Sequence, residues 1–291
     1  MRTGYDAGQA LAWAKSILAQ NQVAIPEWDA ALLLAHVLGV DRVTLHLEGS
    51  RVLLPEESGR FEEAVLRRAS REPLQYIIGS QGFMGLEFAV DRRVLIPRPD
   101  TEILVEAVLD FLSERADQFL VADIGTGSGA IAVSLARLEP RCRVVAVDIS
   151  AGALEVARSN ARSNGVEERI RFLRGDLLEP VRSLGPFDAI VSNPPYISSE
   201  EALLLEPEVR DHEPGIALLS GPDPLAFYRR LASGAGPLLK PGGCLAAEVG
   251  AGRAPEAEAL FRRTLPASFT RVIRDYGGHE RVVMGFAGEV R

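Results

Sequence analysis

The stretch FLVADIGTGSGAIAVSLARL, residues 119–138, changes from an apolar strand pattern through a run of glycines into a helical pattern. Residues 119–124 form a short, mostly apolar run that is typical of a buried strand, and residues 130–138 repeat apolar side chains at helical spacing. The glycines between them allow a tight turn and leave N–H groups at the start of the helix free to meet a ligand. The stretch therefore predicts a strand, a ligand-binding turn and a helix of an α/β sheet.

Strand and helix patterns continue to alternate after this stretch. A helix is expected at residues 153–164, where Gly165 is a natural stop. Further strands are expected at residues 143–149, 170–173, 187–192, 244–249, 271–275 and 282–286. Such alternation is typical of a parallel sheet with helices on both faces, so we predict an α/β fold for this part of the chain.

The first part of the chain has helical patterns only. Apolar residues recur at helical spacing around Leu11 and again around Leu32, and Pro26 and Gly39 are typical of the start and the end of a helix. A third helix is expected after Pro55. These patterns predict a small helical domain at residues 1–73.

A glycine-interrupted segment separates the helical part from the α/β part. Gly79, Gly82 and Gly85 divide short apolar pieces, which favours short strands or a hairpin from residue 74 onward. The sequence thus predicts a hairpin linker at residues 74–95 and a larger domain at residues 96–291.

Charge and composition disfavour several classes of protein. The net charge of −8 argues against a protein that binds nucleic acid through its phosphates. Arg67, Arg68 and Arg71 could form a local basic face, but we expect these residues to lie on a solvated helix surface.

The sequence shows neither a secretion-signal pattern nor an apolar run as long as a membrane span. Two widely spaced cysteines suggest reduced thiols, so we expect a cytoplasmic protein. No metal site is expected, because four histidines are scattered without metal-ligand spacing: His36, His46, His212 and His279.

Polar residues follow four consecutive predicted strands. The glycine loop at residues 123–129 follows the first, and Asp148, Asp176 and Asn193 come at or after the ends of the next three. Ligands of open parallel sheets bind outside the carboxyl ends of the strands. We therefore expect all four elements to line one crevice.

An adenosine-containing cofactor suits these strand ends. The Asp148 carboxylate can accept from both ribose hydroxyls, although it could instead cap the next helix, for which Ser150 is also a candidate. Asp176 and Leu177 could line the adenine, with a carboxylate near its amino group and an apolar side chain over its face. For Asp176, a simple turn residue is the alternative.

The glycine loop alone leaves the cofactor open. Gly125, Gly127 and Ala130 satisfy a loose dinucleotide pattern, and Asp148 lies at a workable distance for a ribose hydroxyl. A nicotinamide oxidoreductase is therefore an alternative, and so is a tight turn without any ligand.

The motif Asn193-Pro194-Pro195-Tyr196 decides between these alternatives. The Asn193 side-chain oxygen and the Pro194 carbonyl can accept both protons of a substrate –NH2 group, and Tyr196 offers a flat face for a planar group. Holding both N–H bonds orients a weakly nucleophilic nitrogen toward an electrophilic methyl group. The motif predicts an S-adenosylmethionine-dependent methyltransferase acting on a planar amide or amine nitrogen. A rigid proline turn beside a buried asparagine is the structural alternative.

Several stretches together resemble one family, the bacterial release factor glutamine methyltransferases (HemK/PrmC), over nearly the whole chain. The most specific are Leu74–Gly79 and Ile96–Glu102, while the Asn-Pro-Pro-Tyr tetrad is shared with enzymes that methylate amino groups of nucleic acids. The other matching stretches are the loop at residues 123–129 and residues 146–150, 192–197, 213–214 and 275–281.

The resemblance implies a helical domain that docks the substrate, a hairpin linker and a seven-stranded class I methyltransferase domain with a Rossmann-like sheet. It implies N5-methylation of the glutamine in the Gly-Gly-Gln motif of peptide chain release factors, a step in translation termination, by a monomer that needs neither membrane nor nucleic acid. S-adenosylmethionine, which becomes S-adenosylhomocysteine, would be bound by Gly125, Thr126, Gly127, Ser128, Gly129, Asp148 and Asn193. Asp176 and Leu177 complete the expected cofactor site, Leu177 standing where some relatives have an aromatic residue.

The tetrad would hold the glutamine amide, with Asn193, Pro194 and Tyr196 as the catalytic residues and Pro195 as a further substrate contact. Arg98 and Glu102 are expected to help shape the pocket.

Two other acceptors are possible for the same chemistry, and one segment of the chain differs from the family pattern. Amino-methylation of a nucleic-acid base, or of a ribosomal-protein glutamine, would use the same tetrad. The segment at residues 220–225 has Ser220 and Pro224 where the family usually has glycines, which is expected to stiffen that loop.

Overall fold

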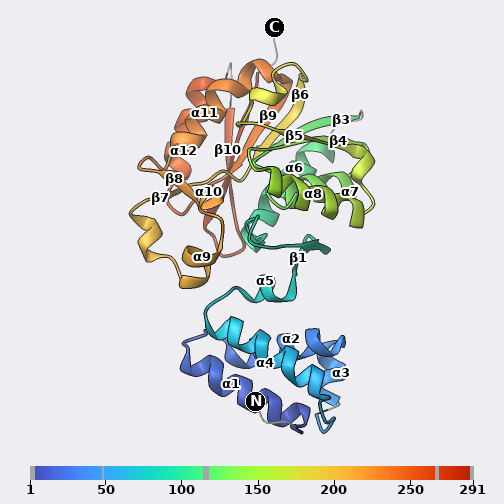
Figure 1. The fold of residues 1–291 in the computed structure, drawn as a ribbon. Helices are drawn as coiled ribbons and strands as arrows, with labels where there is room; N and C mark the ends of the chain where they lie inside the picture. The colour runs from blue at the N-terminus through green and yellow to red at the C-terminus, as the bar shows by residue number, and fades with distance from the viewer. Residues whose placement is uncertain (1–3, 48, 114–117, 266–268, 289–291) are drawn as a thin grey trace. The chain divides into compact units, whose positions relative to one another are not determined.

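A computed structural model describes residues 4–47, 49–113, 118–265 and 269–288 (Figure 1). The chain divides into two compact units. One consists of Met1–Ser80 together with Glu206–His212, and the other of Gln81–Leu205 together with Glu213–Arg291. The chain therefore passes from one unit to the other at three points of the sequence, and a short segment from the second half of the chain completes the N-terminal unit.

The N-terminal unit is helical, as predicted. Its helices are α1 (Ala7–Gln20), α2 (Pro26–Leu38), α3 (Arg42–Leu47), α4 (Pro55–Ala69), α5 (Leu74–Ile78) and α9 (Pro207–His212). The Asp6 side chain caps α1, and Gly39 ends α2 in the left-handed region at φ 67°. Leu18, Leu33 and Phe61 are fully buried between α1, α2 and α4. Strands or a hairpin were expected from residue 74 onward, so the short helix α5 is a difference from the prediction.

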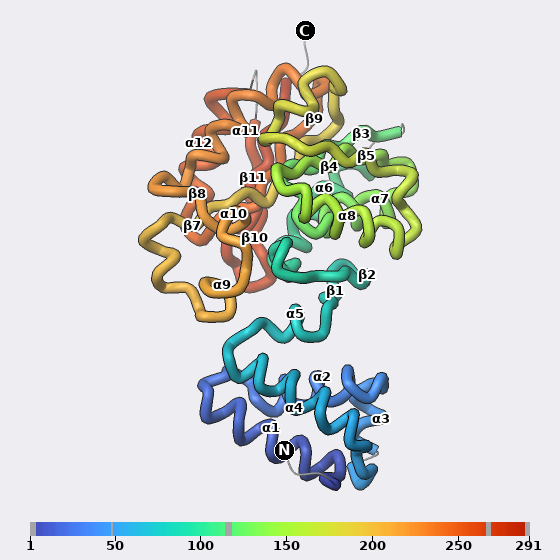
Figure 2. The backbone as a smooth tube through the Cα atoms, in the orientation of Figure 1, coloured from blue at the N-terminus to red at the C-terminus, as the bar shows by residue number. Residues whose placement is uncertain are grey.

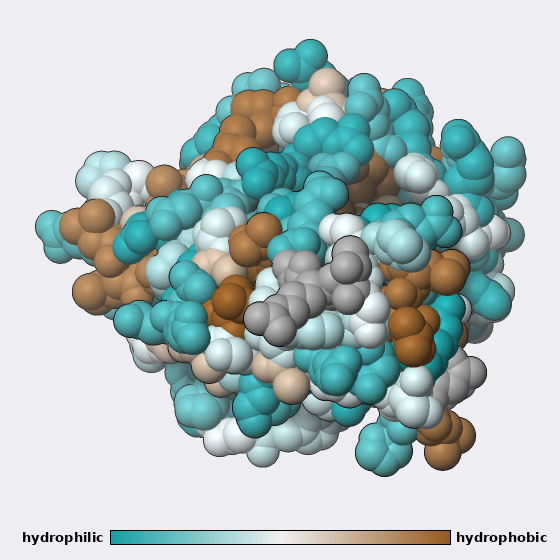
Figure 3. Space-filling model, turned by 60° about the horizontal axis from the view of Figure 1, so that its bottom comes forward, coloured by the Kyte–Doolittle hydropathy of each residue, from teal (hydrophilic) through white to brown (hydrophobic). Residues whose placement is uncertain are grey.

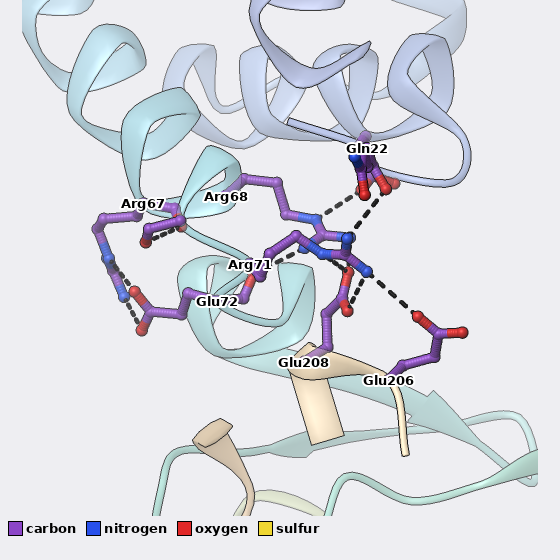
Figure 4. Close-up of polar contacts among 9 residues, drawn as sticks. Gln22, Arg67, Arg68, Arg71, Glu72, Glu206 and Glu208 are labelled. Atoms are coloured by element: carbon purple, nitrogen blue, oxygen red, sulfur yellow. Dashed lines mark hydrogen bonds and ion pairs between the residues drawn. The ribbon is translucent and has the colours of Figure 1, made fainter. Parts of the chain in front are cut away.

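Arginine–carboxylate pairs replace the solvated surface that we expected for α4. Arg68 is only 6% exposed, and its guanidinium donates to Asp29 of α2 and to Glu208 of α9 at 2.7 and 2.9 Å. Arg71 donates to both carboxylate oxygens of Glu208 at 2.7 and 2.6 Å (Figure 4). Arg67 pairs with Glu72. The expectation was wrong because sequence spacing cannot show carboxylates that lie far along the chain, and these pairs neutralise the basic cluster.

The second unit is built on a seven-stranded sheet in the order β10-β11-β9-β6-β3-β4-β5. The strands are β3 (Phe119–Ile124), β4 (Cys142–Asp148), β5 (Ile170–Arg174), β6 (Phe187–Ser192), β9 (Leu239–Glu248), β10 (Phe269–Arg274) and β11 (Glu280–Phe286). The prediction of a parallel sheet was wrong at one strand, because β11 runs antiparallel to both β9 and β10. The short turn between β10 and β11 can join only antiparallel strands, since a parallel connection needs a long crossover.

Helices cover both faces of this sheet (Figures 1 and 2). Val121, Val144 and Ala189 face α6 (Pro99–Ser113), α7 (Ala130–Leu138) and α8 (Ala151–Ser163). Ala122 and Val145, their neighbours in sequence, face α11 (Ala226–Ala235) and α12 (Ala254–Thr264). Adjacent strand residues thus bury side chains in two separate cores, which explains why these strands are apolar almost throughout.

Two small sheets accompany the large one. The predicted hairpin is formed by β1 (Ser80–Phe83) and β2 (Leu86–Ala89), and Asn160 of α8 bonds both the N–H and the carbonyl of Ala89. The second pairs β7 (Ile197–Ser198) with β8 (Leu219–Gly221), where the Ser220 hydroxyl donates to the Ile197 carbonyl. The remaining elements are α10 (Gly215–Leu218), η1 (Glu167–Arg169), η2 (Glu179–Val181), η3 (Glu201–Leu204) and η4 (Gly236–Leu238).

The surface mixes polar and apolar side chains. Hydrophobic residues form separate patches between larger hydrophilic areas on the face seen in Figure 3. Among the most exposed large apolar side chains are Leu203 and Leu204 of η3, at 74% and 87% exposure. Within the described residues, every helix is too short or too polar to cross a bilayer.

Glu208 provides a test of how α9 is held in the helical unit. The Glu208→Gln variant removes the charge shared by Arg68 and Arg71, and should lower the free energy of unfolding of this unit by about 1.5–3 kcal/mol. Urea unfolding and amide hydrogen exchange of residues 206–212 measure the effect. Glu206→Gln is the matched control, because that side chain is 79% exposed and 3.4 Å from Arg71. Equal stability and equal exchange in the two variants would contradict the assigned role of Glu208.

Candidate active site

A pocket of about 310 Å³ lies at the carboxyl ends of β3, β4, β5 and β6. Nine of the predicted site residues line it: Gly125, Thr126, Gly127, Ser128, Asp148, Asp176, Leu177, Asn193 and Pro195. Gly129, Pro194 and Tyr196 are not among the lining residues. The four strand ends that the sequence placed in one crevice do meet there, and further walls come from residues 93–101, 214–217 and α11.

The glycine loop is shaped by its backbone. Gly125 and Gly127 adopt φ angles of 76° and 56°, which side chains disfavour, and an added Cβ at either position would meet no atom within 4 Å. Gly129 also has a positive φ, 81°, and an added Cβ there would in addition stand 3.0 Å from the Cβ of Ala157. The first two glycines therefore shape the pocket floor, while the third lets α7 pack closely against α8.

Asp123, the first residue of the stretch 123–129 and the last but one of β3, is a buried carboxyl to which sequence reasoning gave no role. It is 0% exposed, and its Oδ2 accepts from the Thr126 hydroxyl at 2.6 Å and from the Ala132 N–H at 3.2 Å. Its Oδ1 has no hydrogen-bond partner among the described residues. Burial raises the pKa of Asp123 to about 7.

Asp148 is held at the end of β4 by backbone donors. Its Oδ2 accepts from the Gly127 N–H at 2.9 Å, and its Oδ1 accepts from the Ser150 N–H at 2.8 Å. Ser150 itself caps α8, because its hydroxyl accepts from the Ala153 N–H. The cap is thus Ser150, and the Asp148 carboxylate is fixed in the pocket wall, where burial raises its pKa.

The wall after β5 combines a strained backbone with an ion pair. Leu177 has a φ of 47°, which is uncommon for a residue other than glycine. Asp176 pairs with Arg230 of α11, a pocket residue that the sequence did not single out. The Asp176 carboxylate therefore already has a cationic partner at the pocket rim.

Asn193, after β6, has its amide nitrogen tied to the start of α6. The Asn193 Nδ2 donates to the Thr101 Oγ1 at 3.1 Å, and the Thr101 hydroxyl donates to the Glu248 Oε2 at 2.5 Å. Neither Thr101 nor Glu248 was predicted as a site residue. Thr101 lies in the family-like stretch Ile96–Glu102 but was given no role there, and Glu248 lies outside the matching stretches.

Tyr196 lies mostly buried beside Gly250. An added Cβ at Gly250 would come within 2.8 Å of the Tyr196 Cδ2, so a side chain at residue 250 would displace the ring. Burial raises the pKa of the phenol well above its ordinary value. The ring is therefore a neutral aromatic surface.

Arg98 and Glu102 have different roles in the structure. Arg98 lines the pocket and pairs with Glu213, whose other oxygen accepts from the Ile96 N–H. Glu102 accepts from the Met84 N–H in the hairpin turn at 2.6 Å and does not line the pocket. Of these two residues only Arg98 shapes the pocket wall, and Glu102 fastens the hairpin to α6.

Comparison with known proteins finds one family match in the N-terminal part of the chain and another in the α/β part. Residues 9–79 match the PrmC N-terminal domain family, and residues 100–205 match the methyltransferase small domain family. A methyltransferase structure from Pyrococcus furiosus shares the fold at a TM-score of 0.50 with 18% identity, covering 78% of this chain and 98% of that chain.

Two relatives match over almost the entire length. The release factor glutamine methyltransferase of Moorella thermoacetica is 44% identical over 281 residues, covering 97% of this chain and 98% of the relative. That of Geobacter sulfurreducens is 43% identical, covering 96% of each chain. At this identity over both units, the chain belongs to the release factor glutamine methyltransferase (PrmC/HemK) family of class I methyltransferases.

Proposed function

We propose that this chain transfers a methyl group from S-adenosylmethionine to the side-chain amide nitrogen, N5, of the glutamine in the Gly-Gly-Gln loop of peptide chain release factors. The observation that carries the proposal is the fixed Asn193 amide, which lies in the same pocket as the glycine loop and Asp148. The names of the two full-length relatives support the same substrate.

The pocket residues fit S-adenosylmethionine. The Asp148 carboxylate suits a ribose diol, and the apolar Leu177 side chain suits one face of an adenine. The bound cofactor supplies an electrophilic methyl group on a positively charged sulfur.

The tetrad orients the amide nitrogen of the substrate glutamine for the reaction. Since the Asn193 Nδ2 donates to Thr101, its Oδ1 is left to accept one proton of the glutamine –NH2 group. The sequence motif assigns the other proton to the Pro194 carbonyl, although Pro194 is not among the residues that line the pocket. Two acceptors fix the plane and direction of the amide nitrogen and turn its lone pair toward the methyl donor. They also stabilise the positive charge that grows on nitrogen during transfer. The nitrogen then loses a proton readily, so no strong base is needed.

The proposal also covers how the release factor docks, the oligomeric state and the cellular location. The helical unit is assigned to docking of the release factor, and the enzyme acts as a monomer. The reaction takes place in the cytoplasm, a location that suits the free, buried thiols of Cys142 and Cys244. The same tetrad would hold a base amine or another protein's glutamine, and these are the acceptors to examine if release factor is not methylated.

Transfer of labelled methyl from S-adenosylmethionine to purified, unmodified release factor tests the proposal. We expect label on the wild-type factor and none on a factor whose Gly-Gly-Gln glutamine is changed to alanine, because only the glutamine presents the amide that the tetrad holds. Equal labelling of both factors, or of neither while the enzyme binds cofactor, would rule out this acceptor.

Asn193→Ala separates binding from chemistry. This variant removes one of the two acceptors for the amide protons, and loss of such a group typically lowers kcat by about 10²–10³-fold. The fold and the affinity for S-adenosylmethionine should change little, since Asp148 and the glycine loop remain. Steady-state kinetics with calorimetric cofactor titration measures both quantities, and near-normal turnover would contradict the amide-holding role.

The buried Asp123 carboxyl predicts a pH dependence of stability. The folded pKa of about 7 lies above the ordinary value of the unfolded chain, so the folded state holds a proton that the unfolded state releases. Stability of the cofactor-free protein should therefore fall as pH rises from about 4 to about 7, at about 1.4 kcal/mol per pKa unit. Asp123→Asn should flatten part of this slope in urea unfolding at pH 5 to 7.5. An unchanged slope would show that Asp123 is ionised in the folded state throughout.

A further inference from the structure

Glu248 is a buried carboxylate placed beside the catalytic tetrad. It is the last residue of β9, which pairs with β6 in a register that sets Ser192 opposite Ala247. One residue further along, Glu248 stands next to Asn193. Glu248 is only 3% exposed, and burial of a carboxylate is costly unless its oxygens are bonded.

The bonds of Glu248 form a chain that ends at Asn193. The Glu248 Oε2 accepts from the Thr101 hydroxyl at 2.5 Å. The Thr101 Oγ1 in turn accepts from the Asn193 Nδ2 at 3.1 Å. Thr101 is 5% exposed, so water does not compete freely for its hydroxyl.

The direction of this chain follows from the number of protons. A threonine hydroxyl has one proton, and here that proton goes to a carboxylate that can only accept. The hydroxyl can then only accept from Asn193, which requires the amide nitrogen of Asn193 to face Thr101. The side-chain oxygen is thereby turned away from Thr101. An asparagine amide flipped the other way would present its own –NH2 to the substrate –NH2, donor against donor.

Resting on the proposed function, we infer that Glu248 is a positioning residue for the methyl transfer. Through Thr101, its carboxylate holds the Asn193 amide in the one orientation that presents an acceptor oxygen to the glutamine –NH2 group. Glu248 does not touch the substrate in this account. It acts by keeping the side-chain oxygen of Asn193, and not the amide nitrogen, directed toward the substrate.

The same bonds predict a pH response. Burial raises the pKa of Glu248 to about 7, and the nearby Asp100 raises it as well, whereas the Thr101 hydroxyl, the charge of Arg281 and the nearby Asn193 amide lower it. Tyr196 and Tyr228 are the other titratable groups near this carboxyl, and burial raises the pKa of both phenols well above neutrality. A protonated Glu248 could donate a hydrogen bond to the Thr101 hydroxyl. That hydroxyl could then donate its own proton to Asn193, so the Asn193 amide would no longer be held in one orientation. Turnover should therefore fall as pH drops through about 7.

Glu248→Gln and Thr101→Val test the inference, with Thr101→Ser as the rescue variant that keeps the hydroxyl. We expect Glu248→Gln and Thr101→Val to lower kcat for release factor by about 10–100-fold, as loss of a supporting hydrogen bond does elsewhere. Both should lose the step in kcat near pH 7, while KM for release factor and the dissociation constant of S-adenosylmethionine stay close to wild type. Thr101→Ser should restore most of kcat and the pH step.

The controls separate this inference from the proposed function. Glu256→Gln removes a charge from an exposed site on α12 and should leave turnover and its pH profile unchanged. If wild-type enzyme labels no release factor, the proposed function fails. If wild-type enzyme labels it and Glu248→Gln keeps the wild-type kcat and pH step, the inference alone is overturned. Should Glu248→Gln not fold, Thr101→Val decides by the same criteria.

Discussion

The parallel, in-register pairing of β6, β3, β4 and β5 is the constraint on which the site depends. Ile124 pairs with Val147 on one side and with Ser192 on the other, so these strands reach the same edge of the sheet together. The Ser192 hydroxyl donates to the Ile124 carbonyl at 2.7 Å and fixes the end of β6 beside the end of β3. The glycine loop and the tetrad Asn193–Tyr196 follow these two strand ends directly. Under the proposed function, this arrangement would bring the methyl donor and the acceptor nitrogen into one pocket.

The features set by local sequence were predictable. The boundaries of β3 and β6 agree with their apolar runs, and Pro26 and Gly39 mark the ends of α2 as expected. The pocket residues after the first four strands also followed from sequence, because strand ends of a parallel sheet share one edge.

The features set by distant contacts were not predictable. The antiparallel direction of β11 depends on its partners, and the burial of Arg68 depends on Glu208, which is 140 residues away in the sequence. Thr101 and Glu248 are 147 residues apart, yet they hydrogen-bond each other, and Thr101 also accepts from the amide nitrogen of Asn193. Pairings across such separations leave no periodic signal, so a single sequence does not reveal them.

The structure of the enzyme bound to S-adenosylhomocysteine and a Gly-Gly-Gln peptide would test the central claim most directly. We predict that the glutamine amide nitrogen lies within hydrogen-bond distance of both the Asn193 Oδ1 and the Pro194 carbonyl oxygen. The Asn193 Nδ2 should stay bonded to Thr101. A glutamine amide held by other groups, or an Asn193 amide that turns its nitrogen toward the substrate, would contradict it.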